Sequence, residues 1–225
     1  MKDASPQTIY LTDYTPPTYL VDQVDLTFRL SPNATRVISR IAFRPNPDAV
    51  SKRFFLHGEE LTPISSSIDG TPVTPREVEG GIEVDVPDAP FVWEAEVEIA
   101  PAANTALEGL YMSNGMYCTQ CEAEGFRKIT WYPDRPDVMA PFKVRIEGDE
   151  PVMLSNGNPT ASGDGWTEWT DPWPKPAYLF ALVAGDLVAR EDSFTTMSGK
   201  HVDLKLWVRP GDEGKTASGM EALKK

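Results

Sequence analysis

The sequence predicts an all-β fold in which antiparallel strands pack as a sandwich. Apolar residues recur at every second position in several segments, as at Val24, Leu26 and Phe28, which is typical of strands with one buried face. No long helical periodicity occurs before residue 209. The 21 prolines are spread along the 225-residue chain, and this distribution suits short strands joined by turns.

The expected strands follow one another along the chain with turn signals between them. Alternating segments cover residues 24–30, 82–86, 91–99, 142–146 and 202–208. Residues 178–186 form an unbroken apolar run ending in Gly-Asp, which predicts a strand buried on both faces. Pairs that favour tight turns occur at residues 69–70, 80–81, 156–157, 164–165 and 198–199.

The C-terminal end changes character. Residues 215–225 predict an amphipathic helix whose apolar stripe contains Ala217, Met220 and Leu223. No later segment is available to cover this stripe, so we expect the start of a further domain; a frayed tail is the alternative. The charged residues 190–192, followed by a new hairpin, indicate a boundary near residues 190–194.

Charge and composition exclude several classes of function. A net charge of −13 without a basic cluster argues against nucleic-acid binding, which needs grouped Lys and Arg. No run of 18 apolar residues predicts a membrane span, and residues 1–6 show no apolar core of a secretory signal. With only two cysteines in addition, the expected location is the cytoplasm.

Residues 118–126, CTQCEAEGF, and residues 131–137, WYPDRPD, form the most polar and irregular stretch of the chain. We expect a loop here, because binding residues concentrate in loops. Cys118 and Cys121 lack the βαβ context of a redox site, and only His57 and His201 could complete a zinc site. They are interpreted as ordinary reduced cysteines. Neither histidine belongs to a recognisable catalytic triad, and no H-E-x-x-H motif occurs.

Three tryptophans suggest a different class of function. Trp166, Trp169 and Trp173 lie among prolines and could stack on a sugar or a protein partner if they were exposed together. The alternative hypothesis is therefore a free-standing β-sandwich module that binds carbohydrate or protein.

Long stretches in one order resemble the N-terminal domain of bacterial aminopeptidase N, a zinc exopeptidase. Besides the two stretches above, they are YTPP (14–17), DQVDLTF (22–28), LHGEEL (56–61), PAANTALEGLY (101–111), LSNGN (154–158), DPWPKP (171–176) and YLFALVAGD (178–186).

The resemblance implies a large saddle-like β domain over residues 1–192, with residues 193–225 beginning a thermolysin-like catalytic domain. The family's G-A-M-E-N and H-E-x-x-H motifs do not occur in this chain. The longer enzyme would therefore use zinc to cleave peptides with a free N-terminus, whereas this chain alone would be inactive and hold no metal or catalytic residue. By position, Glu122 would bind the substrate α-amine and Gln120 would line the pocket for the first side chain. The partner of this N-terminal domain within the longer enzyme would be the catalytic domain of the same protein.

Overall fold

A computed structural model describes residues 8 and 10–225. The prediction that the chain has no secretory signal rests on residues 1–6, which lie outside the described residues. The elements in chain order are η1 (Leu11–Asp13), β1 (Tyr19–Arg29), β2 (Thr35–Pro45), β3 (Phe55–His57), β4 (Thr62–Ile68), β5 (Thr71–Pro72), β6 (Arg76–Val78), β7 (Gly81–Glu83), β8 (Phe91–Ile99), η2 (Pro101–Ala103), β9 (Gly109–Ser113), β10 (Met116–Gln120), η3 (Phe126–Lys128), β11 (Met139–Glu147), β12 (Val152–Ser155), β13 (Asn158–Gly163), β14 (Trp166–Pro176), η4 (Ala177–Leu179), β15 (Leu182–Gly185), β16 (Val188–Thr195), β17 (His201–Val208), η5 (Glu213–Lys215) and α1 (Ala217–Leu223).

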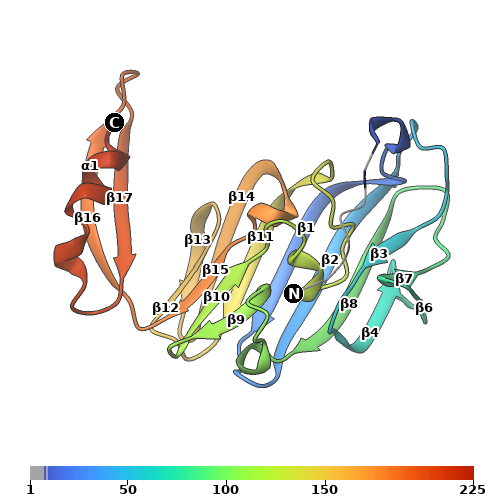
Figure 1. Cartoon of the computed structure of the whole chain (residues 1–225), viewed down its shortest axis with the longest axis horizontal. Coiled ribbons are helices and arrows are strands. Elements are labelled where there is room, and N and C mark those ends of the chain that lie inside the picture. The colour runs from blue at the N-terminus through green and yellow to red at the C-terminus, as the bar shows by residue number, and fades with distance from the viewer. Residues whose placement is uncertain (1–7, 9) are drawn as a thin grey trace.

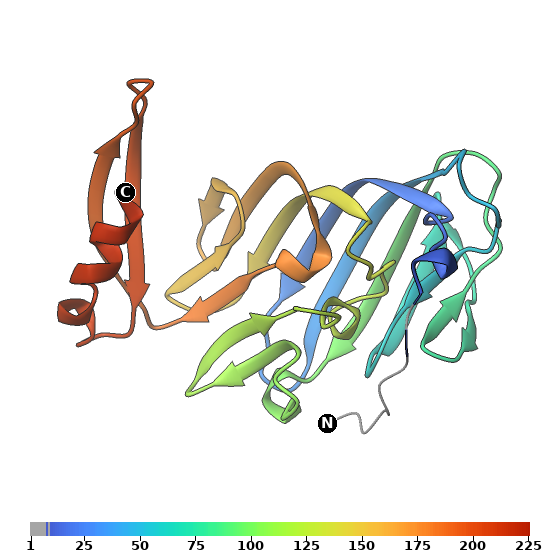
Figure 2. The same ribbon diagram turned by 45° about the horizontal axis from the view of Figure 1, so that its top comes forward.

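The largest sheet has eight strands in the order β13-β14-β11-β1-β2-β8-β4-β5. It is twisted along its length (Figures 1 and 2). Its pairings are antiparallel except at the centre, where β1 runs parallel to β11 with Val24 opposite Phe142. This one pairing departs from the antiparallel arrangement that the sequence predicts for the fold as a whole. The long connection from β2 through β10 makes it possible, since parallel neighbours need a crossover.

A four-stranded sheet, β12-β15-β10-β9, packs across the long sheet, and a three-stranded sheet, β3-β7-β6, completes the body (Figure 1). Phe28 of β1 stacks on Phe180 at 5.8 Å between ring centroids, and Phe180 also meets Phe126 at 5.3 Å. One hydrophobic cluster joins residues of all three sheets. The all-β layered architecture predicted from the sequence is therefore confirmed.

Apolar alternation predicted the central strands well. Val24, Leu26 and Phe28 are buried, as are Phe91, Trp93, Ala95, Val97 and Ile99 of β8 and Phe142, Val144 and Ile146 of β11, whereas the residues between them are more exposed. Four of the five turn signals lie in connections between strands that pair with each other, and Gly81 of one of them begins β7. The fifth, residues 156–157, is a bend between β12 and β13, which pair with other strands. Gly70, Gly80, Gly157, Gly165 and Gly199 have positive φ, which glycine adopts without steric cost.

Two strand predictions are wrong in extent. In residues 82–86 the strand β7 ends at Glu83, so Val84 and Val86 lie outside it, shortly before Pro87. In residues 178–186 a 3-10 turn ends at Leu179, and only Leu182–Gly185 pairs as β15. Proline residues next to each segment restrict the backbone and remove a ladder donor, which an apolar run alone does not reveal.

Strands β16 and β17 form a separate hairpin, and α1 lies against it (Figure 1). The predicted helix is present, and its stripe is covered only at Met220, which is 1% exposed. Ala217 is exposed and Leu223 is 49% exposed, while Leu206 of β17 lies close to Gly219. The hairpin therefore covers one of the three residues of the predicted stripe. The division at residues 192/193 stays a prediction; β16 runs through it without a break.

The only α-helix among the described residues, α1, has seven residues. No helix in this part of the chain is long and apolar enough to cross a membrane.

Candidate functional site

The site begins where β10 ends. This strand pairs with β9 along its length, and Thr119 exchanges hydrogen bonds with Leu182 at the start of β15. The first residues of the 118–126 stretch therefore belong to a strand, which corrects the expectation of a loop throughout. After Gln120 the chain leaves the sheet as an exposed turn.

The structure places the two predicted substrate-binding residues on either side of the point where β10 ends: Gln120 is the last residue of the strand, and Glu122 lies in the turn. Gln120 and Glu122 are both exposed, whereas Cys121 between them is 2% exposed. Gln120 Nε2 donates a hydrogen bond of 3.2 Å to the main-chain oxygen of Glu122. The peptide bond between Glu122 and Ala123 is cis. Burial of Cys121 thus directs its two neighbours outward.

The far end of the turn is anchored in the core. Phe126 is fully buried and packs edge-on against Tyr132 at 5.0 Å and Phe180 at 5.3 Å. Gly125 donates its N–H to Cys121 O, and a Cβ at this glycine would lie 2.5 Å from Gln120 O. Only glycine fits this close approach. The turn is therefore packed tightly against the core at Cys121 and Phe126, while residues 122–124 face solvent.

An acidic cleft of about 500 Å³ opens beside the turn. Its charged lining consists of five carboxylates and two cations: Glu59, Glu60, Glu108, Glu122, Glu124, Arg127 and Lys128. Gln120 does not line it. The excess of negative charge in a partly enclosed space favours a cationic ligand over an anionic one.

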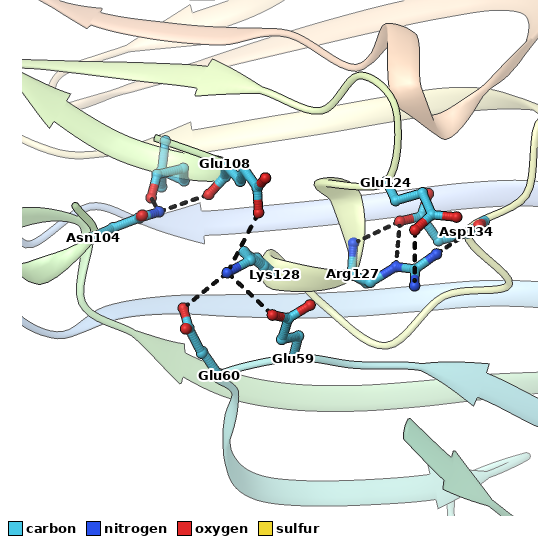
Figure 3. Close-up of polar contacts among 9 residues, drawn as sticks. Glu59, Glu60, Asn104, Glu108, Glu124, Arg127, Lys128 and Asp134 are labelled. Carbon is cyan, nitrogen blue, oxygen red and sulfur yellow. Dashed lines mark hydrogen bonds and ion pairs between the residues drawn. The ribbon is translucent and has the colours of Figure 1, made fainter. Parts of the chain in front are cut away.

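Lys128 joins three of these carboxylates (Figure 3). Its side chain is 6% exposed, and Nζ lies 3.2 Å from Glu60, 3.4 Å from Glu59 and 3.6 Å from Glu108. Burial opposes the charged form, but the hydrogen bond to Glu60 and the charges of Glu59 and Glu60 outweigh it and raise the pKa of Lys128. Lys128 is therefore an ammonium ion that ties the loops after β3 and before β9 to η3.

Arg127 links the cleft to a buried carboxylate (Figure 3). Asp134 has a side chain 2% exposed and accepts hydrogen bonds from Arg127 N and Nε, both at 3.1 Å. Burial raises the pKa of Asp134, and Arg127 opposes that shift. The other side of the guanidinium lies 3.5 Å from Glu124.

Four of the five cleft carboxylates are thus engaged by a cation and one is not. Among the residues that the structure describes, no Lys, Arg or His nitrogen lies within 4.0 Å of the Glu122 carboxylate. A carboxylate next to open space and without an internal counter-ion is available to an external ammonium group.

The sulfur and imidazole groups do not form a metal centre. Burial raises the pKa of Cys121 to about 12, so this side chain is a thiol at neutral pH. His57 Nδ1 accepts a hydrogen bond of 3.2 Å from Asp134 N–H. Across residues 8 and 10–225, no three His, Cys, Asp or Glu side chains converge as metal ligands, and the donors present do not fit zinc.

The three tryptophans do not form one exposed platform. Trp173 is 77% exposed, but Trp169 packs against the core and donates its indole N–H to Met153 O at 3.2 Å. The Trp166 ring lies under the Arg145 guanidinium, 3.9 Å from its centroid. Two of the three rings are therefore engaged within the chain, contrary to the stacking surface that the alternative hypothesis requires.

Sequence reasoning missed Lys128, Arg127 and Asp134 as parts of the site. Each is an ordinary surface residue type; Asp134 lies in the stretch 131–137, but no pattern there indicates its role. The available signal is the position of Lys128 directly before the apolar residues Ile129 and Trp131, since a lysine in such a context is buried only when paired.

Comparison with known proteins shows the family to which the chain belongs. Residues 23–179 match the peptidase M1 N-terminal domain. The chain belongs to the peptidase M1 family. It is 47% identical to aminopeptidase N of Caulobacter vibrioides over 236 aligned residues, covering 100% of this chain and 27% of that protein. The chain therefore spans about a quarter of the length of this M1 relative.

Solved structures agree. Aminopeptidase A of Legionella pneumophila, crystallised with aspartic acid, superimposes with a TM-score of 0.86 at 32% identity, covering 95% of this chain and 27% of that one. The M1 zinc metallopeptidase of Deinococcus radiodurans shares the fold with a TM-score of 0.71 at 17% identity, covering 88% and 49%. The sequence-based assignment to an M1 aminopeptidase N-terminal domain is confirmed.

Proposed function

We propose that this chain is the N-terminal domain of a zinc aminopeptidase that removes residues from the free N-terminus of peptides in the cytoplasm. Glu122 binds the α-ammonium group of the substrate, and Gln120 lines the pocket for the first side chain. The observation that supports this proposal is that Glu122 is the one cleft carboxylate, among the described residues, without a cation within 4.0 Å.

The proposed role follows from the charge of a peptide N-terminus. An α-amine has a pKa of about 7.7–8.0 and is largely protonated at neutral pH. Glu59, Glu60 and Glu108 already share Lys128, so an incoming ammonium group finds its free acceptor at Glu122. A carboxylate in this position selects chain ends over internal peptide bonds, which carry no positive charge.

The tightly packed turn makes this contact reproducible. Cys121 and Phe126 are buried on either side of the exposed segment, so the backbone that positions the Glu122 carboxylate is held in place by core packing. Zinc in the longer protein would polarise the scissile carbonyl and activate water. Because the donor set described here does not fit zinc, we assign this chain only the binding and orientation of the substrate.

The proposal is tested in a longer protein that contains this chain. We expect Glu122→Gln to keep the shape of the side chain and lose a charge-assisted hydrogen bond, typically about 1.5–3 kcal/mol. This loss corresponds to a roughly ten- to hundred-fold fall in kcat/KM for aminoacyl arylamides. Substrate analogues that lack the α-amine never use the contact, so their residual turnover should not fall.

Glu124→Gln is the matched control, because it removes the same charge from the same cleft two residues away. Its effect should stay within about twofold, as expected for an exposed carboxylate. Equal losses in the two variants, or an unchanged kcat/KM for Glu122→Gln on free-amine substrates, would show that Glu122 is a solvated surface charge.

A further inference from the structure

A second cavity, of about 300 Å³, has a polar character opposite to that of the acidic cleft. It lies between the start of β1, the segment that leads into β3, and the turn of residues 133–135. Arg53 and Arg135 line it together with His57, Ser51 and Thr18, and no Asp or Glu is among its described lining residues. In a chain with a net charge of −13, a cavity lined by two guanidinium groups and no carboxylate is unusual.

Several hydrogen-bond donors at this cavity have no partner within the described part of the chain. Arg53 uses only Nε, on Glu83, so both of its terminal nitrogens are free. Arg135 uses Nε and one terminal nitrogen on Asp137 and on Thr15 O, and its other terminal nitrogen is free. The hydroxyl of Ser51 accepts from Arg53 N–H at 3.1 Å but donates to no described residue.

His57 adds a further donor through its tautomer. Its Nδ1 accepts a hydrogen bond from Asp134 N–H, so in the neutral ring the proton resides on Nε2. Burial, and to a lesser extent the charge of Arg127, lower the pKa of His57 to about 4, so the neutral ring predominates at neutral pH. The ring also interacts with the Tyr132 backbone, which opposes the lowering of its pKa. No described residue forms a hydrogen bond with Nε2 itself, which leaves this donor available to a ligand.

The cavity also has a local excess of positive charge and an aromatic wall. Arg53 and Arg76 both pair with the single carboxylate of Glu83, so one of the two charges is unmatched. The Arg53 guanidinium lies 5.1 Å from the Phe55 ring centroid, and that ring meets the His57 ring edge-on at 4.8 Å. These contacts hold a cation and a neutral donor next to apolar surface.

We propose that this cavity binds a small oxyanion, a carboxylate or a phosphate, through Arg53, Arg135 and the Nε2–H of His57. The ligand supplies the acceptor oxygens that these donors lack, and a guanidinium presents its N–H groups in a fork that matches such oxygens. Phe54 and Phe55 line the same cavity and accommodate a short apolar group attached to the anion. At about 300 Å³ the cavity is at the small end of ligand sites, which restricts it to compact ligands.

The test uses the 225-residue chain and two probes, inorganic phosphate and benzoate, at constant ionic strength. The readout is the imidazole ¹H–¹⁵N spectrum, which contains only two histidines. We expect a saturable shift of the His57 ring, with the Nε2–H tautomer retained, while the exposed His201 stays unchanged. Saturation by phosphate alone identifies an inorganic anion as the ligand, and saturation by benzoate alone or by both probes identifies an organic carboxylate site.

Arg53→Met should weaken the binding roughly ten- to hundred-fold, because it removes a charged donor while keeping the apolar stem. Arg29→Met is the matched control: Arg29 also pairs with one glutamate, but it lies at the opposite end of β1. If Arg53→Met fails to fold, Arg53→Lys keeps the charge without the fork and should still weaken binding severalfold. Non-saturable shifts with both probes, or equal weakening by the Arg53 and Arg29 variants, would overturn the proposal.

Discussion

His57 should make the stability of this chain depend on pH in the weakly acidic range. The half-buried ring has its pKa lowered from 6.5 to about 4, first by burial and then by the charge of Arg127, while the Tyr132 backbone and Glu124 oppose the shift. The unfolded chain takes up a proton below its ordinary pKa, and the folded chain does not. The stability contributed by neutral His57 is therefore complete above about pH 6.5 and is lost as the pH falls toward about 4.

The magnitude follows from linkage. Between about pH 7 and about pH 5, such a depression of the pKa removes at most about 2 kcal/mol from the free energy of unfolding. The ring is partly exposed, so solvent screening reduces this to about 1 kcal/mol.

The variant His57→Asn places an amide oxygen near the position of Nδ1, where it can accept the Asp134 N–H. Urea unfolding at the two pH values should show that this variant loses about 1 kcal/mol less stability on acidification than the natural chain does. His201→Asn should lose as much as the natural chain. If His57→Asn and the natural chain weaken equally between the two pH values, the ring is protonated in both states and the reasoning fails.

Two further predictions concern the base of the turn that carries Glu122. Phe126→Ala should lower the free energy of unfolding by about 3–5 kcal/mol in urea titration, since Phe126 is fully buried, whereas Leu179→Ala, at a side chain 52% exposed, should change it by about 0.5 kcal/mol or less. Asp134→Ala leaves the Arg127 guanidinium without its buried partner and should lower the free energy of unfolding by about 3–5 kcal/mol in the same titration. The control Glu124→Ala removes only an exposed partner and should cost about 1 kcal/mol or less. Similar losses in the two variants would contradict the assignment of Asp134 as the buried anchor.

The sequence predicts which face of a strand is buried much better than it predicts which strands pair. Alternation at Val24, Leu26 and Phe28 correctly predicts which side chains of β1 are buried. It cannot predict that β11 lies beside β1 or that the pair is parallel, because period-two burial looks the same for any partner. The register is set by contacts between distant segments, which one sequence alone does not reveal.

The candidate site divides in the same way. Gln120 and Glu122 are predicted from a local stretch that resembles a known domain, and in the structure Gln120 at the end of β10 is hydrogen-bonded to the main chain of Glu122 in the following turn. Lys128 and Glu60 are 68 residues apart, and nothing local indicates that they meet. Only the fold converts an ordinary lysine into the buried counter-ion of three glutamates, so the charge balance of the cleft could not be read from the sequence.

The central pairing of β1 with β11 has a consequence for synthesis of the chain on the ribosome. Arg29 at the end of β1 meets Glu147 at the end of β11, 118 residues later. At roughly 5–20 residues per second, one edge of β1 waits on the order of ten seconds for its partner after it is made. During that interval β1 and β2 form a hairpin whose unpaired backbone edge is a template for wrong strands. Nascent chains shorter than about 150 residues should therefore depend on chaperones, and release from them should follow completion of β11.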